Sequence, residues 1–294
     1  MTTRSGFISV VGRPNVGKST LVNSLVGQKV AITSSRPQTT RNTIRGVLTL
    51  TDPDRQLVLV DTPGLHRPRT ALGERLNKLV YGSLAEADAA VFVLDALQEI
   101  GPGDRLIAAR LAESKLATVV VVNKVDAASK LQVADSLAEA GLWDFAAYVP
   151  LSALQANGLP ALIGELSERL PEGPMYFPAE AHSDQPDRLF AAELIREKYL
   201  ARLAQELPHS VAVVIGDIET RDNGVVHVPA TVFVERDSQK GIVIGKGGAM
   251  IRDVGAEARR DLEVLFGAKC FVDLRVRVEK DWQRRDEALD RMGF

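Results

Sequence analysis

The octapeptide Gly12-Arg13-Pro14-Asn15-Val16-Gly17-Lys18-Ser19 matches the GxxxxGK[ST] pattern of a phosphate-binding loop. It follows an apolar run at Phe7–Val11 that is typical of a strand, and it leads into residues 19–25, which are typical of a helix. In such a loop the backbone N–H groups and the positive end of the helix face an anion. We therefore expect a nucleoside triphosphate site in which Lys18 meets the β- and γ-phosphates and Ser19 binds Mg²⁺.

Length and composition limit the class of protein. A chain of 294 residues is long enough for about two domains. The formal net charge of −2 argues against unspecific coating of nucleic acid, so any such contact should be local. Cys270 is the only cysteine, which excludes an internal disulfide and a cysteine-based metal site. No apolar stretch approaches the roughly 20 residues of a membrane span, and we expect a cytoplasmic protein.

The first 170 residues alternate short β-branched runs with helical segments. This pattern predicts an α/β P-loop domain with a doubly wound, mostly parallel sheet of six strands. Residues 52–55 form a turn-like link, so we expect the second strand along the chain to pair antiparallel with the third at the edge of the sheet. The candidate strands are Phe7–Val11, Thr43–Thr51, Leu57–Val60, Ala89–Leu94, Thr118–Val122 and Ala147–Val149.

Residues 171–187 carry four prolines and little periodicity, which is typical of a linker between domains. Residues 188–280 then change pattern to helix, strand, strand, helix, strand, and residues 281–294 form a tail with no recognisable signature. The expected elements are a helix through Ile195, Tyr199, Leu203 and Leu207, strands Ser210–Arg221 and Val225–Glu235, a helix from Ile251 to Leu265, and a strand Cys270–Val278. Asp222-Asn223-Gly224 predicts a hairpin turn, and Pro229 predicts an edge or a bulge.

The tetrapeptide Asp61-Thr62-Pro63-Gly64 follows a predicted strand, which puts Asp61 at the carboxyl edge of the sheet beside the phosphate loop. We expect its carboxylate to hold Mg²⁺, directly or through water. The N–H group of Gly64 could meet the γ-phosphate, so the segment after it would sense whether that phosphate is present.

The tetrapeptide Asn123-Lys124-Val125-Asp126 follows the predicted strand Thr118–Val122, and it indicates which base the bound nucleotide carries. The Asp126 carboxylate can accept from the ring N–H and the exocyclic amine of guanine, whereas adenine offers no such pair of donors. Asn123 would bond the other edge of the purine, and the stem of Lys124 would cover the ring. Ser152 and Ala153 would add a backbone N–H to the base carbonyl. This predicts GTP or GDP as the ligand.

With these segments in order, residues 6–170 resemble the translation-factor-related class of small GTPases. The resemblance makes residues 34–41 the first switch, in which Thr40, with Thr39 as the alternative, would complete the Mg²⁺ shell. Leu65 stands where many GTPases carry a glutamine that orients water, and leucine cannot do so, which predicts slow intrinsic hydrolysis. Asn15 stands at the loop position that, in GTPases resembling this one, helps to hold a K⁺ ion in place of an arginine finger. The alternative interpretation is that Asn15 only caps the backbone. The candidate catalytic residues are Lys18, Asn15, Thr40 and Gly64.

The segment Gly245-Lys246-Gly247-Gly248 precedes a helix and follows the hairpin. In this order of elements, residues 188–279 resemble a type II KH domain, whose GxxG loop clamps the backbone of four nucleotides of single-stranded RNA. Residues 240–285 hold eleven Lys or Arg against seven Asp or Glu. Arg252 and Arg275 are the candidate phosphate contacts, with Arg277 and Lys280 beside them, and a solvated charged strand face is the alternative interpretation.

Together the motifs GRPNVGKST, QTTR, DTPGL, NKVD and VIGKGG resemble the Era family of bacterial GTPases over nearly the whole chain. The resemblance implies a factor that binds the 3′ end of small-subunit (16S) ribosomal RNA and assists maturation of the small ribosomal subunit. It also allows peripheral association with the cytoplasmic face of the membrane. We expect the protein to be a monomer.

Two other functions compete with a GTP-timed RNA-binding switch. One is a pure binding module whose nucleotide only stabilises the fold; intact Lys18, Ser19 and Asp61 weigh against it. The other is a membrane-associated or cell-cycle signalling GTPase whose second domain binds protein rather than RNA.

Overall fold

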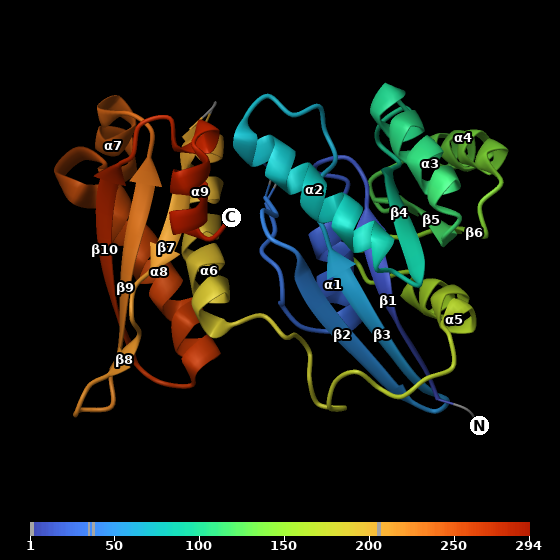
Figure 1. The fold of residues 1–294 in the computed structure, drawn as a ribbon, viewed down its shortest axis with the longest axis horizontal. Helices are drawn as coiled ribbons and strands as arrows, with labels where there is room; N and C mark the ends of the chain where they lie inside the picture. The colour runs from blue at the N-terminus through green and yellow to red at the C-terminus, as the bar shows by residue number, and fades with distance from the viewer. Residues whose placement is uncertain (1–2, 35, 37–38, 205–206) are drawn as a thin grey trace. The chain divides into compact units, whose positions relative to one another are not determined.

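The computed structural model describes residues 3–34, 36, 39–204 and 207–294, which form two compact units. The first unit comprises Met1–Ala31, Thr40–Arg67 and Arg75–Asp184. The second comprises Ile32–Thr39, Pro68–Glu74 and Gln185–Phe294. Each unit has its own hydrophobic core. Figure 1 shows both units, coloured from the N-terminus to the C-terminus. Among the described residues no helix is both long and apolar enough to span a bilayer.

The first unit is built on a six-stranded sheet in the order β2-β3-β1-β4-β5-β6. Only β2 runs antiparallel, with Ile44 opposite Asp61, so the predicted antiparallel edge and mostly parallel sheet are confirmed. Every residue of β4 is buried, as expected for a strand covered on both faces. The strands are β1 (Arg4–Val11), β2 (Ile44–Thr51), β3 (Asp54–Asp61), β4 (Ala89–Asp95), β5 (Ala117–Asn123) and β6 (Ala147–Pro150).

Helices cover both faces of this sheet, which makes it doubly wound (Figure 1). Apolar residues of α1 and α5 pack on one face, and those of α2, α3 and α4 pack on the other. The loops at the carboxyl ends of the strands therefore meet at one edge, where open α/β sheets bind ligands. The helices are α1 (Lys18–Val26), α2 (Ala71–Ala85), α3 (Pro102–Ser114), α4 (Lys130–Ala140) with the 3₁₀ turn η1 (Gly141–Trp143), and α5 (Leu159–Arg169).

The second unit packs helices against one face of a smaller sheet of order β10-β9-β7. Residues of β9 alternate between buried and half-buried, and β9 runs parallel to β10 and antiparallel to β7. This is the predicted type II KH arrangement. Its elements are α6 (Asp187–Arg202), η2 (Leu207–Ser210), β7 (Ala212–Ile215), β8 (Glu219–Thr220), β9 (Val226–Val234), α7 (Asp237–Ile244), η3 (Lys246–Gly248), α8 (Ala249–Phe266), β10 (Cys270–Val278), η4 (Trp282–Arg284) and α9 (Asp286–Met292).

One predicted strand, residues 210–221, is wrong as a single element, because it is split into β7 and β8. The break lies opposite Pro229, whose carbonyl accepts from the N–H of Gly216 at 2.7 Å. The N–H of Val226 points toward β10, so the nitrogen of Pro229, three residues on, points to the opposite side. Proline thus sits on a central strand, at the gap between two short partner strands rather than at an edge.

The helix predicted through Leu207 also ends earlier, at Arg202. Leu203 already has extended backbone, and Leu207 begins a 3₁₀ turn. Pro208 follows directly, and the residue before a proline is disfavoured in helix. Both leucines are nevertheless buried, so the apolar spacing identified core residues correctly and the helix boundary incorrectly.

Ile32, Thr33, Ser34, Arg36 and Thr39, the last three of which belong to the predicted first switch, group with the second unit. Ile32 lies in its core, and the N–H of Thr33 donates to the Glu197 carboxylate at 3.1 Å. The guanidinium of Arg36 donates to the carbonyl of Leu203 at 2.9 Å. Ser35, Pro37 and Gln38 of this switch lie outside the described residues.

The C-terminal segment, which carried no sequence signature, is part of the second unit. Trp282 is fully buried, and its Nε1 donates to the carbonyl of Ser210 at 3.1 Å. Its ring stacks on Phe294 with centroids 5.6 Å apart. The last residues of the chain are therefore packed onto the second unit beside Ser210.

Replacing Trp282 with Ala should lower the free energy of unfolding of the second unit by about 3 to 5 kcal/mol, because a large buried ring is removed. Urea denaturation followed by circular dichroism measures this. Replacing the partly exposed Trp143 of the first unit is the matched control, and a loss below about 1 kcal/mol for Trp282→Ala would contradict the assigned role.

Candidate functional site

The phosphate loop depends on glycine at two positions. Gly12 has φ +156° and Gly17 has φ +98°, values that side chains disfavour. A Cβ on Gly12 would lie 2.5 Å from the carbonyl oxygen of Val93, and one on Gly17 would lie 2.3 Å from Nδ2 of Asn123. The loop is therefore pressed against β4 and the end of β5, and it enters α1 at Lys18.

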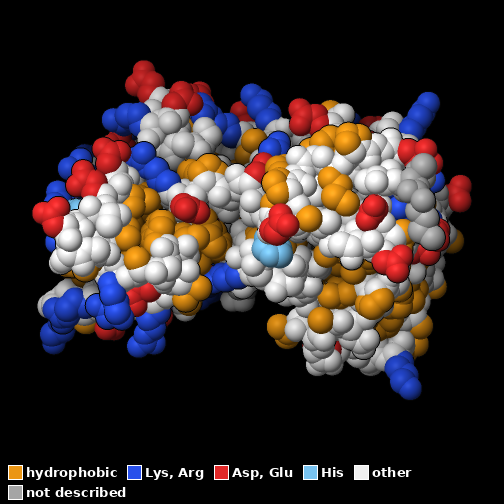
Figure 2. Space-filling view, turned by 90° about the horizontal axis from the view of Figure 1, so that it is seen from below, with side chains coloured by type: hydrophobic (Ala, Val, Ile, Leu, Met, Phe, Trp, Pro, Cys, Tyr) orange, Lys and Arg blue, Asp and Glu red, His pale blue; other side chains and the backbone are white. Residues whose placement is uncertain are grey.

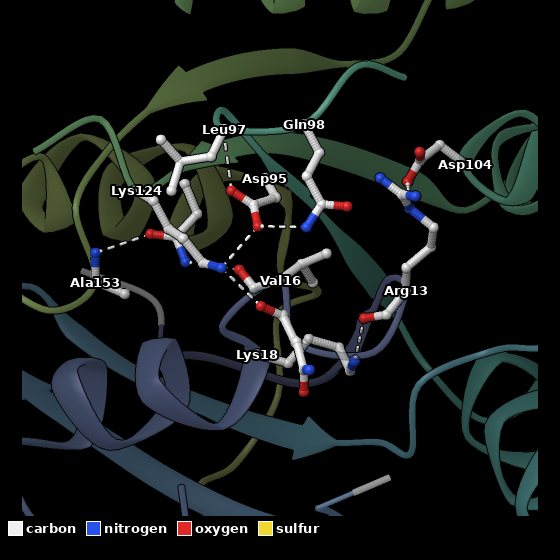
Figure 3. Close-up of polar contacts among 11 residues, drawn as sticks. Arg13, Val16, Lys18, Asp95, Leu97, Gln98, Asp104, Lys124 and Ala153 are labelled. Atoms are coloured by element: carbon white, nitrogen blue, oxygen red, sulfur yellow. Dashed lines mark hydrogen bonds and ion pairs between the residues drawn. The ribbon is translucent and has the colours of Figure 1, made fainter. Parts of the chain in front are cut away.

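Lys18 is held inside this loop and is only 6% exposed. Its Nζ donates to the carbonyl of Gly12 at 3.2 Å and to that of Arg13 at 2.9 Å. Figure 3 shows the contact with Arg13. Burial lowers the pKa of Lys18 to about 8, against the opposing attraction of the Asp61 carboxylate. An anion in the loop would stabilise the ammonium form and raise this pKa again.

Three oxygen ligands converge beside Lys18. The hydroxyl of Ser19 donates to Oδ2 of Asp61 at 2.6 Å, the hydroxyl of Thr40 lies 3.3 Å from the same oxygen, and the two hydroxyls are 3.0 Å apart. The other carboxylate oxygen, Oδ1, is buried without a hydrogen-bond partner among the described residues. Burial raises the pKa of Asp61, while the hydrogen bond from Ser19, the charge of Lys18 and the hydrogen bond from Thr40 oppose the rise.

This set of ligands fits Mg²⁺, which prefers hydroxyl and carboxylate oxygens. The orphaned Oδ1 of Asp61 is the feature that a cation would satisfy. Of the two threonines left open by the sequence, the structure brings Thr40 to the cluster, whereas the hydroxyl of Thr39 donates to the carbonyl of Arg36 at 2.7 Å.

The segment after Asp61 is fixed against the phosphate loop. The hydroxyl of Thr62 donates to the carbonyl of Val10 at 2.7 Å, and Pro63 is buried. A Cβ on Gly64 would lie 2.6 Å from the nitrogen of Pro14, so only glycine permits this approach. Leu65 donates its N–H to Gly12 at 3.3 Å and packs its side chain against the core.

The side chain of Asn123 connects the phosphate loop with the segment at Ala153. Its Nδ2 donates to the carbonyl of Val16 at 2.9 Å, and its Oδ1 accepts from the N–H of Ala153 at 3.0 Å. Ser152 lies beside Ala153 with its hydroxyl accepting from the N–H of Gln155 at 3.1 Å. The predicted segments 12–19, 123–126 and 152–153 are thus neighbours.

Lys124 and Asp126 differ in how they are held. Nζ of Lys124 donates to the carbonyl of Asn15 at 2.8 Å and pairs with Asp95 at 2.6 Å, which lays its stem along the site (Figure 3). The carboxylate of Asp126 is exposed and accepts no hydrogen bond within the described part of the chain. Asp126 is therefore available to accept hydrogen bonds from a ligand.

Sequence reasoning missed two acidic residues that hold the site. Asp95 ends β4 and accepts from Lys124, from Nε2 of Gln98 at 3.1 Å and from the N–H of Leu97 at 3.0 Å. Asp104 pairs with Arg13 at 2.8 Å in the first turn of α3. A carboxylate that ends a buried strand, as Asp95 does, was the available signal.

The second unit presents the predicted glycine loop between α7 and α8. Gly245, Gly247 and Gly248 all have positive φ, and a Cβ on Gly245 would lie 2.7 Å from the nitrogen of Met250. Arg252 donates to the carbonyl of Gly247 at 2.7 Å and so braces the loop. Lys246 is exposed at its tip.

A groove of about 480 Å³ runs between α8 and the edge strand β10. Arg252 lines it, whereas Arg275 pairs with Asp273 at 2.9 Å and is not a lining residue. On this unit, at the left of Figure 2, basic side chains border an apolar surface. The lining residues are Ile251, Arg252, Gly255, Ala256, Arg259, Cys270, Phe271, Val272 and Leu274.

Two family models match the chain. Residues 7–124 match a family described as "50S ribosome-binding GTPase", and residues 206–283 match a KH domain family. The first match covers the phosphate loop and extends to Lys124, and the second covers the glycine loop with its groove.

Comparison with characterised proteins covers the full length. The chain is 49% identical to GTPase Era of Mycobacterium avium and to that of Mycolicibacterium smegmatis, in each case over 99% of both chains. It is similar to the crystal structure of a single-substitution variant of Aquifex aeolicus Era bound to GDP and aluminium fluoride, with a TM-score of 0.95, 34% identity and 99% coverage of each chain.

A second solved structure matches equally well, with a TM-score of 0.95, 34% identity and 99% coverage of each chain. It is Era in complex with MgGDPNP and nucleotides 1506–1542 of 16S ribosomal RNA. With two matched domains and a full-length relationship at 49% identity, this chain belongs to the Era family of GTPases.

Proposed function

We propose that this protein hydrolyses GTP to GDP and phosphate in its first unit and binds the 3′ end of small-subunit ribosomal RNA through its KH domain. Nucleotide state would time RNA binding during maturation of the small ribosomal subunit. The observation that carries the proposal is that one chain combines a GTPase family domain containing a phosphate loop with a KH domain containing a glycine loop and a groove. The Era structure bound to MgGDPNP and 16S ribosomal RNA supports it.

Hydrolysis would use the geometry described above. Ser19, Thr40 and Asp61 would hold Mg²⁺, which neutralises charge on the β- and γ-phosphates when bound. Lys18 would bind the same phosphates, and the N–H of Gly64 would sense the γ-phosphate. Leu65 has no group that could orient water, so intrinsic turnover would be slow. Asn15 would help to hold a K⁺ ion that supplies positive charge in place of an arginine finger.

RNA would lie along the groove beside α8. Lys246 offers an exposed positive charge at the loop, and positive φ at its glycines allows close approach of a sugar–phosphate backbone. Arg252 and Arg259 would supply further charge along the groove.

We also propose a monomer that works in the cytoplasm and associates peripherally with the membrane, as the family resemblance implies. In this proposal residues 1–170 form the GTPase domain, 171–187 the linker, 188–280 the KH domain and 281–294 the tail. The division between the compact units at residues 184 and 185 falls within the proposed linker.

Asp126→Asn should weaken GTP binding by about 10- to 100-fold, because hydrogen bonds to a charged acceptor are lost. The same variant should bind xanthosine triphosphate better, since its amide matches the oxygen of that base. Asp135→Asn, an exposed substitution in the same unit, is the control. An unchanged preference in nucleotide titrations would show that Asp126 does not read the base.

GTP hydrolysis should be about tenfold or more faster in KCl than in NaCl at equal ionic strength, a small part of the roughly 10³- to 10⁵-fold effect of an arginine finger. Asn15→Ala should remove the difference between the salts. Equal rates of phosphate release by the wild-type protein in both salts would rule out the K⁺ role.

GDP binding near pH 8.5 should take up protons at Lys18, because its pKa is about 8 in the free protein and phosphates favour the charged form. Calorimetry in buffers of different ionisation enthalpy counts these protons. The Lys18→Arg variant keeps the charge but does not titrate in this pH range, so it should take up fewer protons when GDP binds. The same proton count for both proteins would contradict the assignment.

Gly247→Asp should abolish or strongly weaken RNA binding, because a carboxylate is placed where phosphates must approach. A Cβ at Gly247 meets nothing within 4 Å, and φ of +58° is tolerated by aspartate, so the fold should persist. Gly293→Asp, at a glycine with φ +83° in open space at the end of α9, is the matched control. Equal RNA affinity for both variants would exclude the loop as the clamp.

A further inference from the structure

Phe271 is an aromatic residue that the KH fold leaves in solvent. It lies in β10, and 49% of its surface is exposed. In the strand register it stands beside His227 of β9, and the two rings stack with centroids 5.6 Å apart and an interplanar angle of 25°. The guanidinium carbon of Arg221 lies 5.2 Å from the centroid of the Phe271 ring. Three side chains from separate elements thus form one exposed aromatic and cationic cluster.

The cluster lies at a defined end of the groove. The chain leaves α8 at Phe266 and enters β10 at Cys270, so the start of β10 lies near the end of α8 and far from the glycine loop. Arg259 and Phe271 line this far end, whereas Ile251 and Arg252 line the end next to the loop. From Ala249 to Arg259 the helix advances about 15 Å. A strand clamped at the loop and following the groove would reach Phe271.

The arrangement orients the ring without burying it. Residues of β10 that face the helices, such as Cys270, are covered, while Phe271 points to the other face of the sheet. Arg221 makes no hydrogen bond or ion pair through its side chain within the described residues, so its guanidinium can meet a phosphate while it stays over the ring. An exposed aromatic face beside a cation suits an unpaired nucleobase, because every base has a face that stacks.

We propose that Phe271, Arg221 and His227 form a stacking platform for the base of one nucleotide beyond the four that the glycine loop clamps. The platform rests on the proposed RNA binding and extends it by one nucleotide at the Arg259 end of the groove. Phe271 stacks the base, Arg221 contacts its phosphate, and His227 holds the ring of Phe271 in register.

Single-stranded oligonucleotides from the 3′ end of 16S ribosomal RNA, each with 2-aminopurine at one position, test the platform. With the full chain, fluorescence at one position outside the clamped nucleotides should be quenched by stacking. Phe271→Ala should abolish that quench and lower the affinity for the oligonucleotide by about 5- to 150-fold, which is the usual effect of removing a stacked aromatic residue. Phe271→Trp should keep both, which shows that the site is folded.

Two controls separate this platform from RNA binding in general. Val264→Ala changes an exposed apolar residue of α8 that does not line the groove, and it should bind as the wild-type protein does. Gly247→Asp should lose affinity for every oligonucleotide. If Phe271→Ala keeps the wild-type affinity and quench while Gly247→Asp fails to bind, the platform is wrong and the proposed RNA function stands. If the wild-type protein binds none of the oligonucleotides, both are wrong.

Discussion

The first unit depends on keeping an ammonium and a carboxylate buried side by side at the carboxyl edge of a parallel sheet. Lys18 and Asp61 are both buried, and burial disfavours the charged form of each. Without a ligand they are stabilised by each other, by carbonyls of the phosphate loop and by the hydroxyls of Ser19 and Thr40. Phosphate oxygens and a divalent cation would supply the charges that this cluster lacks. The loop glycines, the strand order and the packing of α1 all serve to hold this pair in place.

The segment that ends at Thr40 links the Asp61 cluster to the second unit. Thr40 contacts Asp61, whereas Thr39, one residue earlier, groups with the second unit. The segment before Thr39 is held there by Ile32 in the core and by Arg36 on the carbonyl of Leu203. A change in the ligands of Asp61 would therefore act on a residue whose chain neighbour already belongs to the second unit.

Much of the GTP site could be predicted from sequence, because its residues lie in short motifs at the ends of strands. The phosphate loop, Asp61, Asn123 and Ala153 meet because parallel strands bring their carboxyl ends together. Asp95 escaped prediction because its partner Lys124 follows a different strand, β5, and is 29 residues away in sequence. The same holds for Asp104 and Arg13, which are 91 residues apart in sequence.

In the second unit the order of elements was predictable, while boundaries set by tertiary contacts were not. The split between β7 and β8 depends on Pro229 of a neighbouring strand, and the burial of Trp282 depends on a carbonyl at Ser210. Arg275 shows the limit of charge counting, since it pairs with Asp273 and does not line the groove. Phe271, which carried no signal in the sequence, becomes notable only through its neighbours His227 and Arg221.

In the proposed function, nucleotide state controls RNA affinity. Fluorescence anisotropy with a labelled oligonucleotide from the 3′ end of 16S ribosomal RNA tests it directly, with the protein saturated either with GDP or with a non-hydrolysable GTP analogue and Mg²⁺. Coupling of the usual size predicts that the GTP-analogue form binds the RNA about 5- to 150-fold more tightly than the GDP form. Equal affinities in the two states would show that nucleotide state does not control RNA binding.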